Sequence, residues 1–128
     1  MNALVVDDDS LNRELLQRML VRLGWRVDEA SNGRSAIACC GKARYDMVFV
    51  DVLMPGMDGL ATAKAIRKLY AKEDYQTCVL AVTGSYCDAA SSALFDGVLS
   101  KPFVLEELST SINAAPQSRD KRGKQNPE

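Results

Sequence analysis

The residues best suited to chemistry in this chain are carboxylates that stand directly after short apolar runs. Asp7, Asp8 and Asp9 follow one such run, and Asp51 follows another, over residues 47–50. Carboxylates within a few ångströms of one another repel, so either one of them keeps a proton or a cation lies among them. The pattern favours a site for Mg²⁺, which in proteins binds one or two carboxylates together with waters and phosphate oxygens.

A hydroxyl and an ammonium group also stand after short apolar runs. Thr83 follows the apolar run over residues 78–82, and Lys101 follows the short run over 98–99. Lys101 would supply positive charge to the oxygens of a phosphoryl group, and Thr83 would donate a hydrogen bond to one of them. Asp51 is then placed as a nucleophile that would form an acyl phosphate.

The absence of histidine excludes several kinds of site. The chain contains none, so it lacks the commonest general base and the commonest transition-metal ligand, and with them most hydrolase triads and zinc sites. The four cysteines form no C-x-x-C pair. We expect all four to be reduced and buried: Cys39, Cys40, Cys78 and Cys87.

Length and charge further limit the class of protein that this chain can be. At 128 residues, 47% of them hydrophobic, the chain has the size and composition of one soluble domain. Residues 1–116 carry 12 basic against 15 acidic side chains, and residues 117–128 carry four basic against two acidic, so no direct contact with nucleic acid is expected. With no signal peptide and no apolar run near the ~20 residues of a membrane span, we expect a cytoplasmic protein without membrane insertion.

Apolar runs and helical patterns alternate along the chain. Each strand-like run is followed by apolar residues at helical spacing; the strand-like runs lie at 4–6, 26–30, 47–50, 78–82 and 98–99, and the helical patterns at 11–23, 36–40, 63–70, 86–95 and 105–112. Ser10 is the expected N-cap of the first helix, and Asp58 that of the third. The alternation predicts a parallel sheet with helices on both faces, which is an α/β, doubly wound fold.

The predicted sheet decides where the reactive residues meet. In an open parallel sheet, the functional crevice lies outside the carboxyl ends of the strands, where the strand order reverses. The aspartates end the first strand, Asp51 the third, Thr83 the fourth and Lys101 the fifth. We therefore expect carboxylates, a hydroxyl and an ammonium group at one edge of the sheet.

Four segments resemble the signature motifs of the response regulator receiver domain of two-component signalling. In chain order they are VVDDD at 5–9, VDVLMPGMDG at 50–59, VTG at 82–84 and SKPF at 100–103. The resemblance covers about residues 3–114 and implies a flavodoxin-like (βα)5 fold with strand order 2-1-3-4-5. It sets the receiver domain at residues 1–115, and residues 116–128 are expected to form a disordered basic tail or a truncated linker.

The resemblance implies a metal site. Asp51 matches the phosphoacceptor, and Asp7 and Asp8 match the acidic pair that holds Mg²⁺ together with Asp51. The backbone carbonyl of Leu53 matches a further ligand of the metal. Asp9 lies one position past the acidic pair and is interpreted as a helix-start residue.

A second group of matches concerns the phosphoryl group. Thr83 matches the switch hydroxyl, and Lys101 matches the lysine that contacts the phosphoryl group. The bond between Lys101 and Pro102 is typically cis in this family. Gly56 and Gly59 are expected to serve turn geometry.

Two positions depart from the usual pattern or vary within it. Val98 stands where receivers usually carry Tyr, Phe or His. Switching is then expected to run through backbone movement of the Thr83 loop and the fourth helix, or through a nearby ring such as Tyr86 or Phe103, or the domain only relays phosphate. Leu53 occupies a position that tunes the access of water to the acyl phosphate, and its bulk predicts slow self-dephosphorylation.

The leading interpretation is a phosphorelay receiver that takes a phosphoryl group from phosphohistidine on a histidine kinase or a histidine phosphotransfer protein. Phosphorylation would change the face formed by the fourth helix, the fifth strand and the fifth helix. Through this face the domain would bind a downstream protein or form a phosphorylation-dependent dimer. Such a protein is a signalling phosphoacceptor and not an enzyme, since it catalyses only its own phosphorylation and dephosphorylation.

Three other interpretations stay open. A degenerate receiver would act as a phosphorylation-independent interaction module. A Mg²⁺-dependent phosphatase of the haloacid dehalogenase type would place its nucleophile after the first strand, at Asp7 instead of Asp51. A flavodoxin-like FMN carrier would need a first loop that cradles phosphate, and the three carboxylates in this loop would repel that anion.

Overall fold

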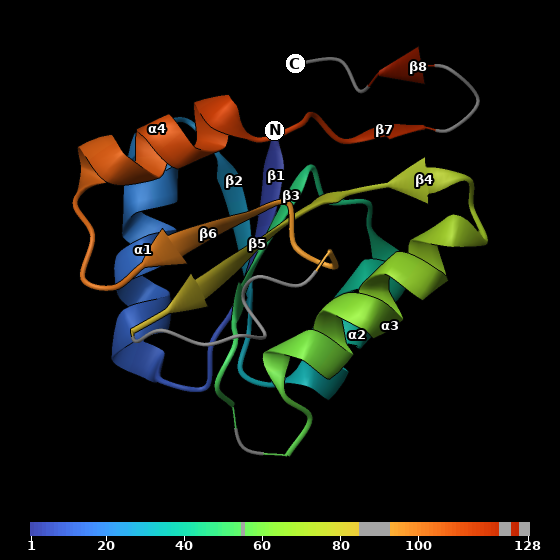
Figure 1. The fold of residues 1–128 in the computed structure, drawn as a ribbon, viewed down its shortest axis with the longest axis horizontal. Coiled ribbons are helices and arrows are strands. Elements are labelled where there is room, and N and C mark those ends of the chain that lie inside the picture. Colours follow the sequence, from blue (N-terminus) through green and yellow to red (C-terminus); the bar gives the residue numbers. More distant parts are fainter. Residues whose placement is uncertain (55, 85–92, 121–123, 126–128) are drawn as a thin grey trace.

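A computed structural model describes residues 1–54, 56–84, 93–120 and 124–125. At its centre lies a five-stranded parallel sheet (Figure 1), made of β1 Asn2–Val6, β2 Arg26–Ala30, β3 Met47–Asp51, β5 Cys78–Thr83 and β6 Gly97–Ser100. The spatial order is β2-β1-β3-β5-β6. Counting these five strands alone, this is the predicted order 2-1-3-4-5, so the α/β fold class and the strand order are confirmed.

The side chains of the central strand β3 alternate between two apolar cores. Val48 and Val50 belong to one core, and Met47 and Phe49 belong to the other. All four are buried, because both faces of the sheet are covered. A strand covered on both faces has no polar side, which is why β3 is an unbroken apolar run in the sequence.

Helices cover both faces of the sheet. α2 Gly33–Lys42 and α3 Gly59–Ala71 pack on the face of the first core, and α1 Ser10–Arg22 and α4 Leu105–Ala114 pack on the other (Figure 1). Of the helix predicted over 86–95, residues 86–92 lie outside the described residues, and 93–94 form a turn. No helix in the described part of the chain is both long enough and apolar enough to cross a membrane.

Aspartates begin the first and third helices. Asp9, and not Ser10, is the N-cap of α1. Its carboxylate accepts hydrogen bonds from the backbone N–H groups of Leu11 (2.9 Å) and Asn12 (3.3 Å). The prediction of Ser10 was wrong by one residue, because Asp9 has extended backbone and Ser10 is already helical. Asp58 caps α3 as predicted and accepts a backbone N–H of the first turn at 2.8 Å.

A second, antiparallel sheet was not predicted. β4 Tyr75–Gln76 pairs with β7 Arg119–Asp120, which pairs in turn with β8 Lys124–Gln125. β4 stands directly before β5, so this sheet lies near the amino ends of the parallel strands, away from the edge that carries the acidic residues. Strands of two residues give no apolar run, and no pattern in the sequence marks them.

The start of the C-terminal segment differs from the disordered tail expected over residues 116–128. Ser118 is buried, and its hydroxyl donates a hydrogen bond to Oδ1 of Asp46 at 3.1 Å. The backbone N–H of Asn2 donates to Oδ2 of the same carboxylate at 2.7 Å. Polar partners on the domain therefore hold this part of the segment, although it lacks large apolar side chains. The boundary between residues 115 and 116 stays a prediction.

Two of the predicted buried cysteines are confirmed. Cys40 and Cys78 are buried, Cys39 is half-buried, and all three are free thiols. Burial raises the pKa of Cys40 to about 11 and that of Cys78 to about 12. Thiols with such pKa values stay protonated at neutral pH and are poor nucleophiles. Cys87 lies outside the described residues.

Candidate functional site

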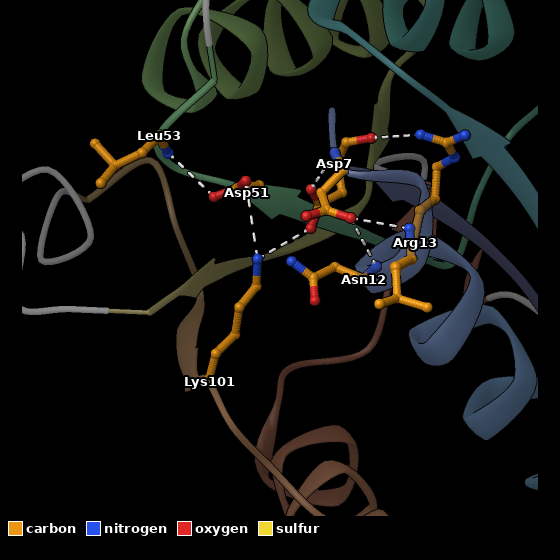
Figure 2. A network of polar contacts seen from close by, with 8 residues as sticks. Asp7, Asn12, Arg13, Asp51, Leu53 and Lys101 are labelled. Atoms are coloured by element: carbon orange, nitrogen blue, oxygen red, sulfur yellow. Dashed lines mark hydrogen bonds and ion pairs between the residues drawn. The ribbon is translucent and has the colours of Figure 1, made fainter.

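Four of the residues predicted to form the site lie where parallel strands end. Asp7 directly follows β1, Asp51 ends β3, Thr83 ends β5, and Lys101 directly follows β6. The three residues Asp7, Asp51 and Thr83 are at most 9% exposed. Because the strands end at one edge of the sheet, these residues come together, as Figure 2 shows for Asp7, Asp51 and Lys101.

The acidic residues form a cluster that could hold a metal ion. One carboxylate oxygen from each of Asp7, Asp8 and Asp51 lies within 4.8 Å of the other two. Asp7 and Asp51 are buried, and Asp8 is exposed. Two enclosed oxygens and one that faces solvent suit a hard cation that keeps part of its water shell, and Mg²⁺ is such a cation.

Lys101 balances part of the negative charge of this cluster. Its Nζ lies 3.0 Å from Oδ2 of Asp7 and 3.8 Å from Oδ2 of Asp51. Its backbone N–H donates a hydrogen bond to the carbonyl oxygen of Thr83 at 2.7 Å, which joins the loop after β6 to the end of β5. The peptide bond between Lys101 and Pro102 is cis, as the resemblance implied.

A backbone N–H two residues further along the chain holds each buried carboxylate (Figure 2). Asp9 donates its N–H to Oδ1 of Asp7 at 2.9 Å, and Leu53 donates its N–H to Oδ1 of Asp51 at 3.2 Å. Oδ2 is the carboxylate oxygen that faces Lys101 in both residues. The side chain of Leu53 is 61% exposed, and the role of its carbonyl as a metal ligand stays a prediction.

Asp51 has a raised pKa in the metal-free protein. Burial raises it from the ordinary 3.8 to about 6, and the negative charges of Asp7 and Asp8 add to the increase. The ammonium group of Lys101 and the N–H of Leu53 oppose it. A carboxyl group that is this costly to ionise gains from a cation placed beside it.

Replacing Asp51 with asparagine is expected to stabilise the metal-free protein at neutral pH. The folded state holds the carboxyl proton more tightly than the unfolded chain, so this contribution to stability is complete below about pH 4 and is lost as the pH rises through about 6. Asparagine imitates the protonated form at every pH. We expect urea denaturation in EDTA to give a gain of up to about 3 kcal/mol near pH 8, falling toward zero near pH 4. A variant less stable than the wild type near pH 8 would contradict the assignment.

Arg13 supports the site and was not predicted. Its Nη1 donates a hydrogen bond to the backbone carbonyl oxygen of Asp7 at 2.8 Å (Figure 2). Its Nε lies 3.3 Å from Oε1 of Glu29. These contacts join α1 to the ends of β1 and β2. The sequence gives no signal for this role, because Glu29 comes near Arg13 only when β2 pairs with β1.

Gly59 allows a close approach between α3 and the strand that carries Asp51. A Cβ atom at Gly59 would collide with the backbone carbonyl oxygen of Asp51 and with Cα of Val52. The expectation that Gly59 serves turn geometry is therefore replaced by a packing role. Gly56, with φ 79°, does adopt the left-handed conformation that favours glycine.

The residues proposed for switching are placed only in part. Val98 lies on β6 and is 46% exposed. Phe103, one of the two rings considered, packs against the core on the side of α1. Tyr86, the other, lies outside the described residues. The route by which this domain switches stays a prediction.

Comparison with protein families and curated proteins places these features in a known group. The family described as the response regulator receiver domain matches residues 3–113. Response regulator MprA of Mycolicibacterium vanbaalenii is 39% identical over 113 residues, which are 87% of this chain and 48% of that protein. Sensor histidine kinase AruS of Pseudomonas aeruginosa is 35% identical over 112 residues, which are 84% of this chain and 11% of that protein. The chain thus spans about half of the first relative and a smaller part of the second.

Solved structures match over nearly their whole length. The chemotaxis protein CheY4 of Vibrio cholerae has a TM-score of 0.79 at 31% identity, with 90% of this chain and 98% of that chain covered. The response regulator TrrA of Thermotoga maritima, in complex with Mg²⁺ and BeF, has a TM-score of 0.75 at 34% identity, with 88% and 96% covered.

Proposed function

This chain belongs to the response regulator receiver domain family of two-component systems, and from that premise we propose that Asp51 is its phosphoacceptor in a Mg²⁺-dependent reaction. The observation that carries the proposal is the group around Asp51. Asp7 and Asp8 lie within reach of one shared cation, and the ammonium of Lys101 lies 3.8 Å from the Asp51 carboxylate.

The transfer would join one carboxylate oxygen of Asp51 to phosphorus. An O–P bond forms, and the bond between phosphorus and the leaving group breaks. Lys101 would contact one phosphoryl oxygen, and the hydroxyl of Thr83, from the end of the next strand, would donate a hydrogen bond to another.

Asp7, Asp8, Asp51 and the backbone carbonyl of Leu53 are the proposed ligands of Mg²⁺. When bound, Mg²⁺ would supply positive charge that offsets the negative charge of the carboxylates and of an incoming phosphoryl group. Two observations support this choice of cation: all the ligands are oxygens, and the relative TrrA was solved with Mg²⁺ and BeF.

We infer that the phosphoryl donor is a phosphohistidine on a histidine kinase or a histidine phosphotransfer protein. A sensor histidine kinase, AruS, is among the relatives. The downstream protein would contact the face that includes β6 and α4, where Val98 is 46% and Val104 is 58% exposed. The same face would serve a phosphorylation-dependent dimer, and the proposed location of the protein is the cytoplasm.

Incubation with acetyl phosphate, with and without Mg²⁺, tests the phosphoacceptor. We expect the intact mass to increase by one phosphoryl group only when Mg²⁺ is present, and the modified peptide to contain Asp51. The Asp51→Asn variant should gain nothing. Asp58→Asn is the matched control, because Asp58 caps α3 and lies outside the acidic cluster, and it should be labelled like the wild type.

The same experiment separates the alternative functions. Label on Asp7 instead of Asp51 would favour a phosphatase of the haloacid dehalogenase type. A wild-type protein that takes no label in Mg²⁺ would favour a phosphorylation-independent interaction module.

A further inference from the structure

Asp8 differs from the other two residues of the acidic cluster in how its carboxylate is held. The carboxylates of Asp7 and Asp51 each accept a backbone N–H and lie near the ammonium group of Lys101. The carboxylate of Asp8 is exposed and forms no hydrogen bond or ion pair with the residues that the structure describes. The position of this carboxylate therefore depends on the backbone that carries it.

The peptide group between Asp7 and Asp8 is held by Arg13. Nη1 of Arg13 donates a hydrogen bond to the carbonyl oxygen of this peptide at 2.8 Å (Figure 2). Within the described part of the chain, this oxygen accepts no other hydrogen bond, and the N–H of the same peptide, which belongs to Asp8, donates none. A peptide group is planar, so the direction of its carbonyl determines where Cα of Asp8 lies. The contact with Arg13 thus helps to fix the backbone of Asp8.

Arg13 is itself held by a second contact. Its Nε lies 3.3 Å from Oε1 of Glu29 on β2, and its side chain is only 19% exposed, so water and salt screen this ion pair little. The guanidinium group is rigid and planar, and one contact at Nε and another at Nη1 together fix its direction. The N–H of Asp7 is held as well, since it donates to the carbonyl oxygen of Ala30 at 3.1 Å.

We propose that Arg13 is a positioning residue for the Mg²⁺ site and holds the peptide between Asp7 and Asp8 in the direction that brings the Asp8 carboxylate to the cation. The inference rests on the proposed function, because it takes the acidic cluster as the site of Mg²⁺. The positive charge of Arg13 repels a bound cation, and Glu29 offsets part of this repulsion. Orientation by Arg13 strengthens Mg²⁺ binding and its charge weakens it, so the sign of the change in affinity separates the two effects.

Titration of Mg²⁺ alone into the Arg13→Met variant tests the proposal. Methionine keeps an aliphatic side chain and removes every N–H donor. We expect the dissociation constant of Mg²⁺, followed by the backbone amide NMR signals of the full chain, to rise about tenfold over that of the wild type, as is usual when a contact that orients a metal ligand is lost. If the charge of Arg13 were the main effect, the dissociation constant would fall instead.

A second variant and a control separate orientation from charge and from folding. Arg13→Lys keeps the charge and one donor group, so its dissociation constant should rise only about threefold. This variant also decides if Arg13→Met fails to fold, since a constant equal to that of the wild type would overturn the proposal. Arg18→Met is the matched control on α1, because Arg18 is 73% exposed and pairs with Glu14 of the same helix. Its dissociation constant should stay within about twofold of the wild-type value.

Labelling by acetyl phosphate separates the metal site from the phosphoacceptor. Arg13→Met should need about tenfold more Mg²⁺ for its half-maximal rate, whereas its rate at saturating Mg²⁺ should stay within about twofold of the wild type. A rate that stays low at saturating Mg²⁺, or a dissociation constant that is unchanged or lower, would overturn the role of Arg13. A wild type that binds Mg²⁺ but takes no label would overturn the transfer to Asp51, and the dissociation constants would still decide the role of Arg13.

Discussion

Phosphorylation of the Lys101→Met variant by acetyl phosphate is expected to proceed about a hundredfold more slowly than that of the wild type. Within the described residues, Lys101 provides the positive side chain that forms an ion pair with Asp51, with Nζ 3.8 Å from Oδ2. The carboxylate of Asp51 and the negative phosphoryl oxygens come closest together in the transition state, so a cation fixed at this point lowers the barrier more than it strengthens donor binding. The measurement is the initial rate of mass gain at saturating Mg²⁺.

The variant should remain folded, which separates a loss of rate from a loss of structure. Methionine keeps the length of the aliphatic side chain, and the backbone hydrogen bond from Lys101 to Thr83 does not need the ammonium group. Lys101→Arg is the matched control, since it keeps the charge but spreads it over a planar group. Its rate of phosphorylation should fall between those of the wild type and Lys101→Met. A Lys101→Met rate within about threefold of the wild type would contradict the proposed role.

The residues at the carboxyl ends of the parallel strands could be predicted because their positions depend on local signals in the sequence. Each parallel strand is a short apolar run, and the polar residue that ends the run marks the carboxyl end of the strand. Asp7, Asp51, Thr83 and Lys101 were located in this way, and the structure places all four where strands end. Their convergence followed from a general property of parallel sheets and needed no knowledge of side-chain contacts.

Contacts between distant residues could not be predicted in the same way. Arg67 on α3 lies 2.9 Å from Asp96, 29 residues away, and donates from Nε to the carbonyl oxygen of Leu94 at 2.7 Å. Asp96 accepts the N–H of Val79 at 2.8 Å and so fixes the start of β6 against β5. These residues help to hold the strand that leads to Lys101, yet no spacing in the sequence links them.

The C-terminal segment shows a different limit. Its composition predicts disorder, since residues 117–128 lack large apolar side chains. Hydropathy cannot predict that the Ser118 hydroxyl meets Asp46 or that Arg119–Asp120 pairs with Tyr75–Gln76. Both contacts depend on groups that the rest of the fold brings to the amino ends of the strands.

Replacing Gly59 with alanine is expected to lower the free energy of unfolding by about 3 kcal/mol. The added Cβ would collide with the carbonyl oxygen of Asp51, the last residue of the central strand β3, and with Cα of Val52, the residue that follows it. These backbone atoms cannot move out of the way, whereas the end of a flexible side chain could. Either α3 shifts away from the sheet or the end of β3 moves, and the second response displaces the phosphoacceptor. Urea denaturation measures the loss.

Gly41→Ala is the matched control for this prediction. Gly41 lies in α2, and a Cβ there would meet no atom within 4 Å. Alanine also restricts the unfolded chain more than glycine does, so this variant should gain about 0.5 to 1 kcal/mol. If Gly59→Ala lowers the free energy of unfolding and Gly41→Ala raises it, the loss at Gly59 comes from the close approach to the strand and not from a general helical preference of alanine. A Gly59→Ala protein as stable as the wild type, with an unchanged rate of phosphorylation, would mean that α3 can move from the strand end without disturbing Asp51.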